Sequence, residues 1–175
     1  YTFTLNLRND ASNRFGKNTN NRFYPVWSTG FRWDLHQEKW FPRQKWINEI
    51  TLRTSYGHQG NVVSNISPNT LVSYVSKDLI TNEEQLQLDQ LPNPDLKWEK
   101  TTSLNIGTDF SLFQNRLNIS FDLYKKKISD IVVEKEIPIE NGFQKMFINS
   151  GTLDNQGYEL EIEAIPVQTN LWEWR

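Results

Sequence analysis

Residues 101–124 read TTSLNIGTDFSLFQNRLNISFDLY, and this stretch decides the fold class. Its first half places apolar or β-branched side chains at every second position up to Leu112, and its second half does so again from Leu117 onward. Polar side chains occupy most of the positions between them. Because successive side chains of a strand point to opposite faces of a sheet, the stretch predicts two antiparallel strands joined by a tight turn at Gln114-Asn115.

The same period-two alternation recurs about seven times along the 175 residues. Further predicted strands lie near residues 2–8, 23–34, 46–56 and 158–164, and a seventh begins at Trp172 and Trp174. Helical periodicity is limited to residues 82–91, where the spacing allows one or two helical turns. The chain is therefore predicted to be all-β and antiparallel.

The composition excludes several function classes. The formal net charge of −2 provides no electrostatic surface for nucleic acid. The absence of cysteine excludes disulfides, a thiol nucleophile and a cysteine-ligated zinc site. The mean hydropathy is −0.67, and no apolar stretch approaches the roughly 20 residues of a transmembrane helix. A transmembrane barrel is compatible with these values, because its strands alternate and its loops are polar.

The predicted connections favour such a barrel. Long connections cover about residues 9–21, 57–97 and 128–155, and the connections between them are short. Transmembrane barrels combine long extracellular loops with short periplasmic turns. The predicted strands of about 9–14 residues are also long enough to cross a bilayer when tilted.

Aromatic side chains gather near both ends of the predicted strands. Those near the short turns are Trp33, Trp40, Phe41, Trp46, Phe113, Trp172 and Trp174, and those near the long loops are Phe23, Tyr24, Tyr56, Trp98 and Tyr124. Two such groups predict girdles at the two membrane interfaces. The alternative is a soluble carbohydrate-binding β-sandwich, in which the apolar strand faces would form a core between two sheets.

No catalytic, cofactor or metal site is predicted, and an enzyme is not expected. His36 and His58 lack carboxylates at ligand spacing. The serines lack the Gly-x-Ser-x-Gly context of a nucleophile elbow. Asp154 opens a possible calcium loop, but the downstream acid of that loop type is missing, so a turn is favoured.

Ligand binding is the more plausible chemistry for the long loops. Aromatic faces and amide groups of the kind found there bind sugars and peptides. The candidate ligand-binding residues are Asn61, Tyr74 and Trp98. The alternative is that these side chains only pack the loops.

Several short sequence motifs resemble those of one protein family, and they occur in the order in which that family has them. The most specific is NPDLKWEKTT at 93–102. The others are NRFG (13–16), NNRFYP (20–25), RTSYGHQGN (53–61), NIG (105–107), NRL (115–117), DLY (122–124), NSG (149–151) and NQGYEL (155–160). Together they cover nearly the whole chain and resemble SusC-like TonB-dependent transporters. Small departures occur at His58-Gln59 and Tyr158.

This resemblance implies a plugged barrel of about 22 strands in the bacterial outer membrane. This chain would supply six or seven of the strands and would contact outer-membrane lipid. The resemblance also implies import of a glycan, oligosaccharide or peptide energised through the TonB complex, with a SusD-like surface lipoprotein as a lid. Both chain ends fall within strand patterns, so we expect the plug and the remaining strands elsewhere in a longer protein.

Overall fold

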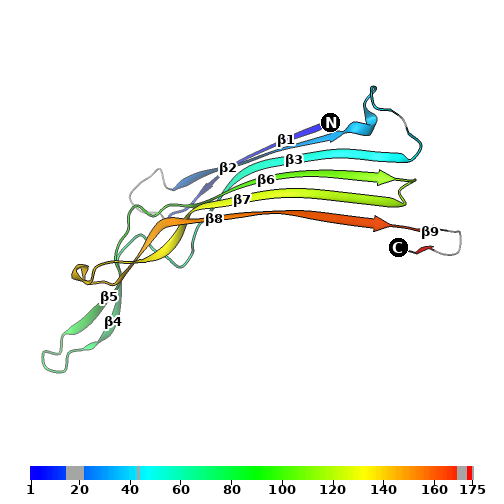
Figure 1. Cartoon of the computed structure of the whole chain (residues 1–175). Coiled ribbons are helices and arrows are strands. Elements are labelled where there is room, and N and C mark those ends of the chain that lie inside the picture. Colours follow the sequence, from blue (N-terminus) through cyan, green and yellow to red (C-terminus); the bar gives the residue numbers. More distant parts are fainter. Residues whose placement is uncertain (15–21, 43, 169–172, 175) are drawn as a thin grey trace.

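The computed structural model describes residues 1–14, 22–42, 44–168 and 173–174. Its main feature is one six-stranded antiparallel sheet in the order β1-β2-β3-β6-β7-β8 (Figure 1). The strands are β1 (Thr2–Ala11), β2 (Phe23–Asp34), β3 (Ile47–Asn61), β6 (Glu99–Leu112), β7 (Leu117–Glu136) and β8 (Lys145–Ala164). The prediction of an all-β, antiparallel chain is confirmed, and the sheet is open rather than closed into a barrel.

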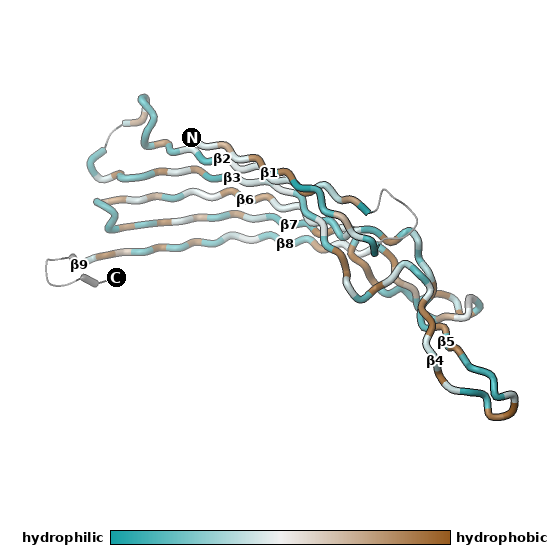
Figure 2. The backbone as a smooth tube through the Cα atoms, turned by 180° about the vertical axis from the view of Figure 1, so that it is seen from behind, coloured by the Kyte–Doolittle hydropathy of each residue, from teal (hydrophilic) through white to brown (hydrophobic). Residues whose placement is uncertain are grey.

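The strand register sorts the side chains into two faces. One cross-strand row runs Phe31–Thr54–Ile106–Leu123–Tyr158 from β2 to β8, and the adjacent row runs Arg32–Arg53–Gly107–Asp122–Glu159. Since residues paired across antiparallel strands share a face, these rows define an apolar face and a polar face. The alternation is visible along the strands in Figure 2.

The apolar face is not covered by any other element among the described residues. Large side chains such as Phe3, Leu160 and Ile162 are exposed, and Tyr158 is 76% exposed. The surface area of 13108 Å² far exceeds the about 8,900 Å² expected for a compact protein of 20.7 kDa. A β-sandwich would bury this face against a second sheet, so the soluble-sandwich alternative does not describe this structure.

The stretch between β3 and β6 contains a separate hairpin, which projects beyond the sheet (Figure 1). It is formed by β4 (Leu71–Lys77) and β5 (Glu84–Gln90). The expectation of helical turns within 82–91 is therefore wrong. Strand alternation of Leu86 and Leu88 with glutamine and aspartate accounts for the outcome, because the hairpin partner β4 supplies the hydrogen bonds that a short helix would lack.

The connections differ in extent from the predicted ones. The stretch 128–155 is mostly strand, because β7 and β8 extend into it from its two ends and leave only residues 137–144 as a connection, with the 3-10 turn η3 (Ile139–Asn141). Likewise β3 extends to Asn61. The connection from β2 to β3 spans residues 35–46, including η2 (Leu35–Gln37), and is longer than predicted. The period-two apolar pattern marks only the part of each strand with one apolar face, so it ends before the pairing ends.

The aromatic residues form two groups, one at each end of the strands. At the loop end the members differ from those predicted. At the turn end, Trp46 stacks on Phe113 with ring centroids 6.2 Å apart, and Trp33 lies 6.3 Å from Trp40. At the loop end, Trp27 and Tyr56 lie 5.4 Å apart on the apolar face.

Some predicted members of the girdles lie elsewhere. Tyr24 and Trp98 are buried beneath the loops, and Tyr124 is on the polar face. Trp172 lies outside the described residues, as does the side chain of Trp174. The predicted seventh strand is seen only as β10 (Glu173–Trp174), which pairs with β9 (Val167–Gln168) outside the main sheet. Among the described residues, no helix has the length and apolar character needed to cross a membrane.

Candidate functional site on the polar face and at the loop end

A charged cluster lies at the middle of the polar face, on β3, β6 and β7. The Arg53 guanidinium donates to Asp109 through Nε (2.6 Å) and Nη2 (2.9 Å), and Nη2 also lies 3.2 Å from Asp122. Ser120 donates to Asp109 at 2.8 Å. Two carboxylates thus hold one guanidinium across three strands, with the bidentate geometry that suits arginine.

Gly107 makes this cluster possible. It lies between Arg53 and Asp122 in the cross-strand row. A Cβ atom at Gly107 would overlap the Asp122 carboxylate and would lie 3.0 Å from Arg53 Nη2. The arginine therefore crosses β6 only because this position carries no side chain.

A second charged group is centred on Arg32, one strand away. Its Nε lies 2.9 Å from Asp34 and its Nη2 lies 2.9 Å from Glu49. Thr51, fully buried, donates to Asp34 at 3.1 Å. The charges of these two groups are thus paired laterally within the sheet.

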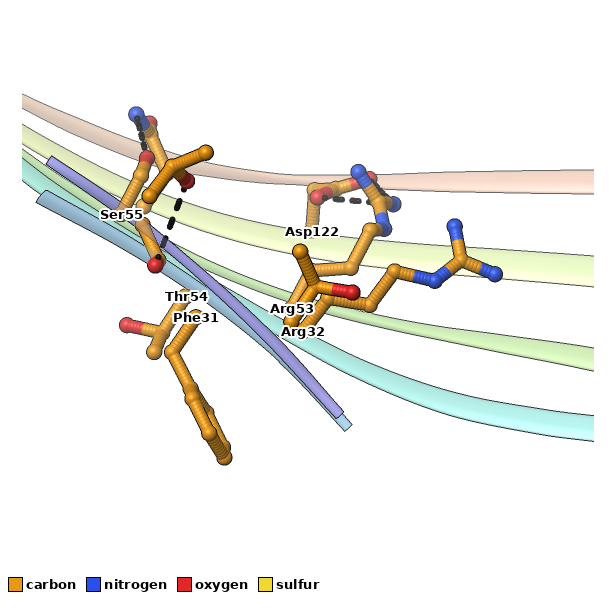
Figure 3. Close-up of a pocket in the computed structure, with 11 residues that line it drawn as sticks. Phe31, Arg32, Arg53, Thr54, Ser55 and Asp122 are labelled. Carbon is orange, nitrogen blue, oxygen red and sulfur yellow. Dashed lines mark hydrogen bonds and ion pairs between the residues drawn. The ribbon is translucent and has the colours of Figure 1, made fainter. Parts of the chain in front are cut away.

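The two arginines border a hollow of about 400 Å³ on the sheet. Figure 3 shows Arg53 and Asp122 together on one side of the strands, with Phe31 directed away from them. The side chains of Arg53, Asp109 and Asp122 are each about one-third to two-fifths exposed. This surface can bind polar groups of a ligand or of another protein segment.

At the loop end, a small buried cluster anchors the connection between β3 and β6. Its members are Tyr24, Leu96 and Trp98, and the Tyr24 and Trp98 rings stack with centroids 5.6 Å apart. Both rings lie over Gly60, where a Cβ atom would come within 2.6 Å of Tyr24 and 2.9 Å of Trp98. This is the largest apolar cluster buried within the described part of the chain.

Two asparagines fasten the segment 93–99 to β8. The Asn149 side chain accepts from the Lys97 backbone N–H (2.9 Å) and donates to the carbonyls of Lys97 (2.9 Å) and Asp130 (2.7 Å). The Asn93 amide donates to the Phe147 carbonyl at 2.7 Å. The motif at 93–102 thus has a structural role, because it holds the connection between β3 and β6 against β8.

Asp130 completes the fastening. It lies at a bulge in β7 with φ 57°, and its carboxylate is 3.0 Å from Lys97 Nζ and 3.1 Å from Lys100 Nζ. Burial disfavours the charged form of this carboxyl, but hydrogen bonds from Lys97 and Lys100 outweigh it and hold the pKa of Asp130 below its ordinary value. Ion pairs thereby join β7 to the connection between β3 and β6 and to the start of β6.

The hairpin tip has a defined turn with an apolar surface. The backbone N–H groups of Thr81 (2.9 Å) and Ile80 (2.8 Å) donate to the Asp78 carboxylate and lower the pKa of Asp78. Leu79 and Ile80 are fully exposed beside it. The tip therefore presents two aliphatic side chains on a structured turn.

The three predicted ligand-binding residues do not form one site. Trp98 is only 7% exposed, so its ring packs the loop. Asn61 donates to the Glu99 carboxylate at 2.8 Å. Tyr74 lies on β4 in the projecting hairpin and is 56% exposed.

Sequence reasoning missed the cluster around Arg53. Alternation assigned Arg53, Asp109 and Asp122 to polar strand faces, which was the available signal, but the register that brings them together is a tertiary property. Within the described residues, no group of three or more histidine, aspartate or glutamate side chains is placed to hold a metal ion.

An open sheet with one exposed apolar face, one polar face and strands long enough to cross a bilayer defines the wall of a transmembrane β-barrel. A family model described as "TonB dependent receptor-like, beta-barrel" matches residues 1–175. The chain belongs to this family, whose barrels lie in the bacterial outer membrane.

Comparisons with individual proteins agree. The chain is 34% identical to TonB-dependent receptor P39 of Formosa agariphila, over 99% of this chain and 16% of the relative. It is 30% identical to TonB-dependent receptor SusC of Bacteroides thetaiotaomicron, over 99% of this chain and 18% of that protein. The resemblance to SusC-like transporters is thus confirmed.

A solved structure gives the same result in three dimensions. The RagAB peptide importer in its "open-open" state superposes with a TM-score of 0.84 at 30% identity, over 98% of this chain and 18% of that one. The chain spans less than a fifth of each of these proteins. It is therefore a segment of a barrel wall, and its apolar face is the lipid-facing side.

Proposed function

We propose that this chain forms part of the wall of a TonB-dependent importer, which moves a nutrient inward across the bacterial outer membrane. The nutrient is a glycan, an oligosaccharide or a peptide. The observation that carries the proposal is the separation of apolar and polar side chains onto opposite faces of the sheet. The apolar face suits contact with lipid, and the polar face suits a water-filled lumen. Similarity to SusC and to the RagAB peptide importer supports import as the activity.

The same similarity supports two partner proteins for the full-length importer. A SusD-like or RagB-like lipoprotein would cover the loop end of the barrel, and the TonB complex would supply energy through parts of the protein beyond this chain. The connections 12–22, 62–98 and 137–144 would lie on the extracellular side, and 62–98, the longest connection of the sheet, fits the general asymmetry of such barrels. Tyr74 on the projecting hairpin stays a candidate for contact with ligand, together with Asn61 at the rim.

The proposal assigns no catalysis to this chain. Receptors and transporters make up the family, and Arg32 and Arg53 on the polar face are paired with carboxylates of the same sheet. A structural and binding role suits charges that are paired in this way. Trp98 has a packing role in this arrangement.

The test uses the full-length protein in its host. Uptake of labelled oligosaccharide and peptide mixtures is measured in the wild-type strain, in a strain lacking the gene, and in a strain lacking TonB. We expect both deletions to abolish uptake of one of the two mixtures, and expression of the full-length gene to restore it in the first deletion strain. Undiminished uptake of both mixtures after deletion of the gene would refute the proposal.

A further inference from the structure

The apolar face carries a groove that the import function does not use. The groove has a volume of about 410 Å³ and lies over β6, β7 and β8. Its apolar walls are formed by Leu104, Ile106, Leu123 and Tyr158, and Lys125 and Gln156 also line it. In the register, Leu104–Lys125–Gln156 is the row next to Ile106–Leu123–Tyr158 on the loop side, so the polar groups close the loop end of the groove.

Lys125 stands at the level where the apolar face ends. Toward the turn end, the rows of this face on the same three strands are Thr108–Phe121–Leu160 and Phe110–Ile119–Ile162. Toward the loop end, the next row is Thr102–Lys127–Asp154. Tyr56 of the aromatic pair is the Cα partner of Leu104 in the row of Lys125. Interfacial aromatics and snorkelling lysines share the headgroup level of a bilayer.

The charge of Lys125 has no counter-ion within the described part of the chain. Lysine ion pairs there are made by Lys97, Lys100 and Lys145. The acid nearest along the same face is Asp154, which is the register partner of Lys127 rather than of Lys125. Gln156, the actual partner of Lys125, is neutral. Lys125 is therefore available to an anion outside the protein.

We propose that this groove binds an acyl chain of a phosphorylated lipid of the outer leaflet, with the Lys125 ammonium on the lipid phosphate. The apolar walls remove the chain from neighbouring lipid at no cost in hydrogen bonds, and the ammonium supplies a point charge for phosphate. The loop end of such a barrel faces the outside, so the lipid belongs to the outer leaflet, and phosphorylated lipid A is the probe for it. This site goes beyond import and does not depend on which nutrient is carried.

The test compares neighbouring lysines on opposite faces. Lys126 pairs with Ser103 and Asn155 on the polar face, so Lys126→Gln removes the same charge without touching the groove. The full-length receptor in detergent is titrated with phosphorylated lipid A and with lipid A stripped of its phosphates, and bound lipid is counted by native mass spectrometry. We expect Lys125→Gln to weaken binding of the phosphorylated lipid by about fivefold and Lys126→Gln to leave it unchanged.

A second variant tests the groove itself. Ile106→Trp fills the space between Leu123 and Tyr158 and keeps the face apolar. It should weaken binding of both lipids by the same factor, because it excludes the acyl chain. Equal effects of the two lysine variants would overturn the role of Lys125, equal binding of the two lipids by the wild-type receptor would overturn phosphate recognition, and unchanged binding by Ile106→Trp would overturn the groove as the site.

Discussion

Gly107 and the arginine beside it show how single residues organise the polar face. An arginine in a barrel wall needs carboxylates within reach, and the side chains of Asp109 and Asp122 come from two different strands. The guanidinium reaches both only by passing over a position without a Cβ atom. Lateral pairing leaves the guanidinium with carboxylate partners inside the sheet, which limits the cost of placing this charge in the wall.

The residue scale yields the prediction for Gly107→Ala. The added methyl group would overlap the Asp122 carboxylate and crowd the Arg53 guanidinium. We expect the free energy of unfolding of the full-length receptor to fall by about 1–3 kcal/mol. Urea unfolding in detergent, followed by tryptophan fluorescence, measures this change.

A double-mutant cycle supplies the control. In an Asp122→Ala background the carboxylate is gone, so Gly107→Ala should cost less there by at least about 0.5 kcal/mol. An identical cost in both backgrounds would show that the overlap with Asp122 is not the cause.

Among the elements, β7 and β8 each have two halves of different character. Both have 20 residues, but only the half near the turn has one apolar face. The register shifts on either side of Ile131 bend β7, and Asp130 there turns its carboxylate toward Lys97 and Lys100. The loop-end halves of β7 and β8 thereby hold the connection between β3 and β6 in place.

The element scale yields the prediction for Asn149→Ala. Removing this side chain leaves the Lys97 N–H and C=O without their partners in a partly buried place. We expect the free energy of local opening of residues 93–99 to fall by about 1–3 kcal/mol, with no change in the sheet. Hydrogen exchange of the full-length receptor measures both regions.

Asn155→Ala is the matched control. Asn155 lies on the same strand and its side chain is exposed. Exchange within 93–99 should be the same in this variant as in the wild type. Faster exchange throughout the sheet of Asn149→Ala would mean that the side chain supports the strands rather than the connection.

At the scale of the whole molecule, the structure is a wall without an interior of its own. Among the described residues, β1 and β8 are edge strands with one neighbour each in the main sheet, and the buried hydrophobic residues are only Tyr24, Leu96 and Trp98. Unpaired edges and an uncovered apolar face favour association with other chains. Stability must therefore come from the remaining strands of the barrel and from lipid.

The prediction at this scale concerns residues 1–175 produced alone. We expect this chain to associate in detergent-free buffer, to bind a hydrophobic dye, and to melt without a cooperative transition. Size-exclusion chromatography, dye fluorescence and thermal circular dichroism check these three properties. The full-length receptor in detergent, which should melt cooperatively, is the control, and a monomeric, cooperative melt of the isolated chain would contradict the assignment of the apolar face to lipid.

Much of this molecule can be predicted without coordinates. Alternation in residues 101–124 determines two strands and their faces, because the side-chain period of a strand is two. The segment 93–99 indicates the family. The hairpin 71–90 was not predictable in this way, because the alternation in β4 is weak and the pairing of β4 with β5 depends on the turn at Asp78.

The sequence by itself determined which residues face lipid and which face the lumen, and thereby the class of protein, since local geometry alone assigns alternate side chains to opposite faces. Only the tertiary structure decided that Arg53 meets Asp109 and Asp122, that Trp98 is buried and that β7 and β8 run on beyond the membrane level. Those outcomes depend on register and on contacts between distant segments. Beyond the bilayer both strand faces meet water or protein, so no hydrophobic period marks the strands there.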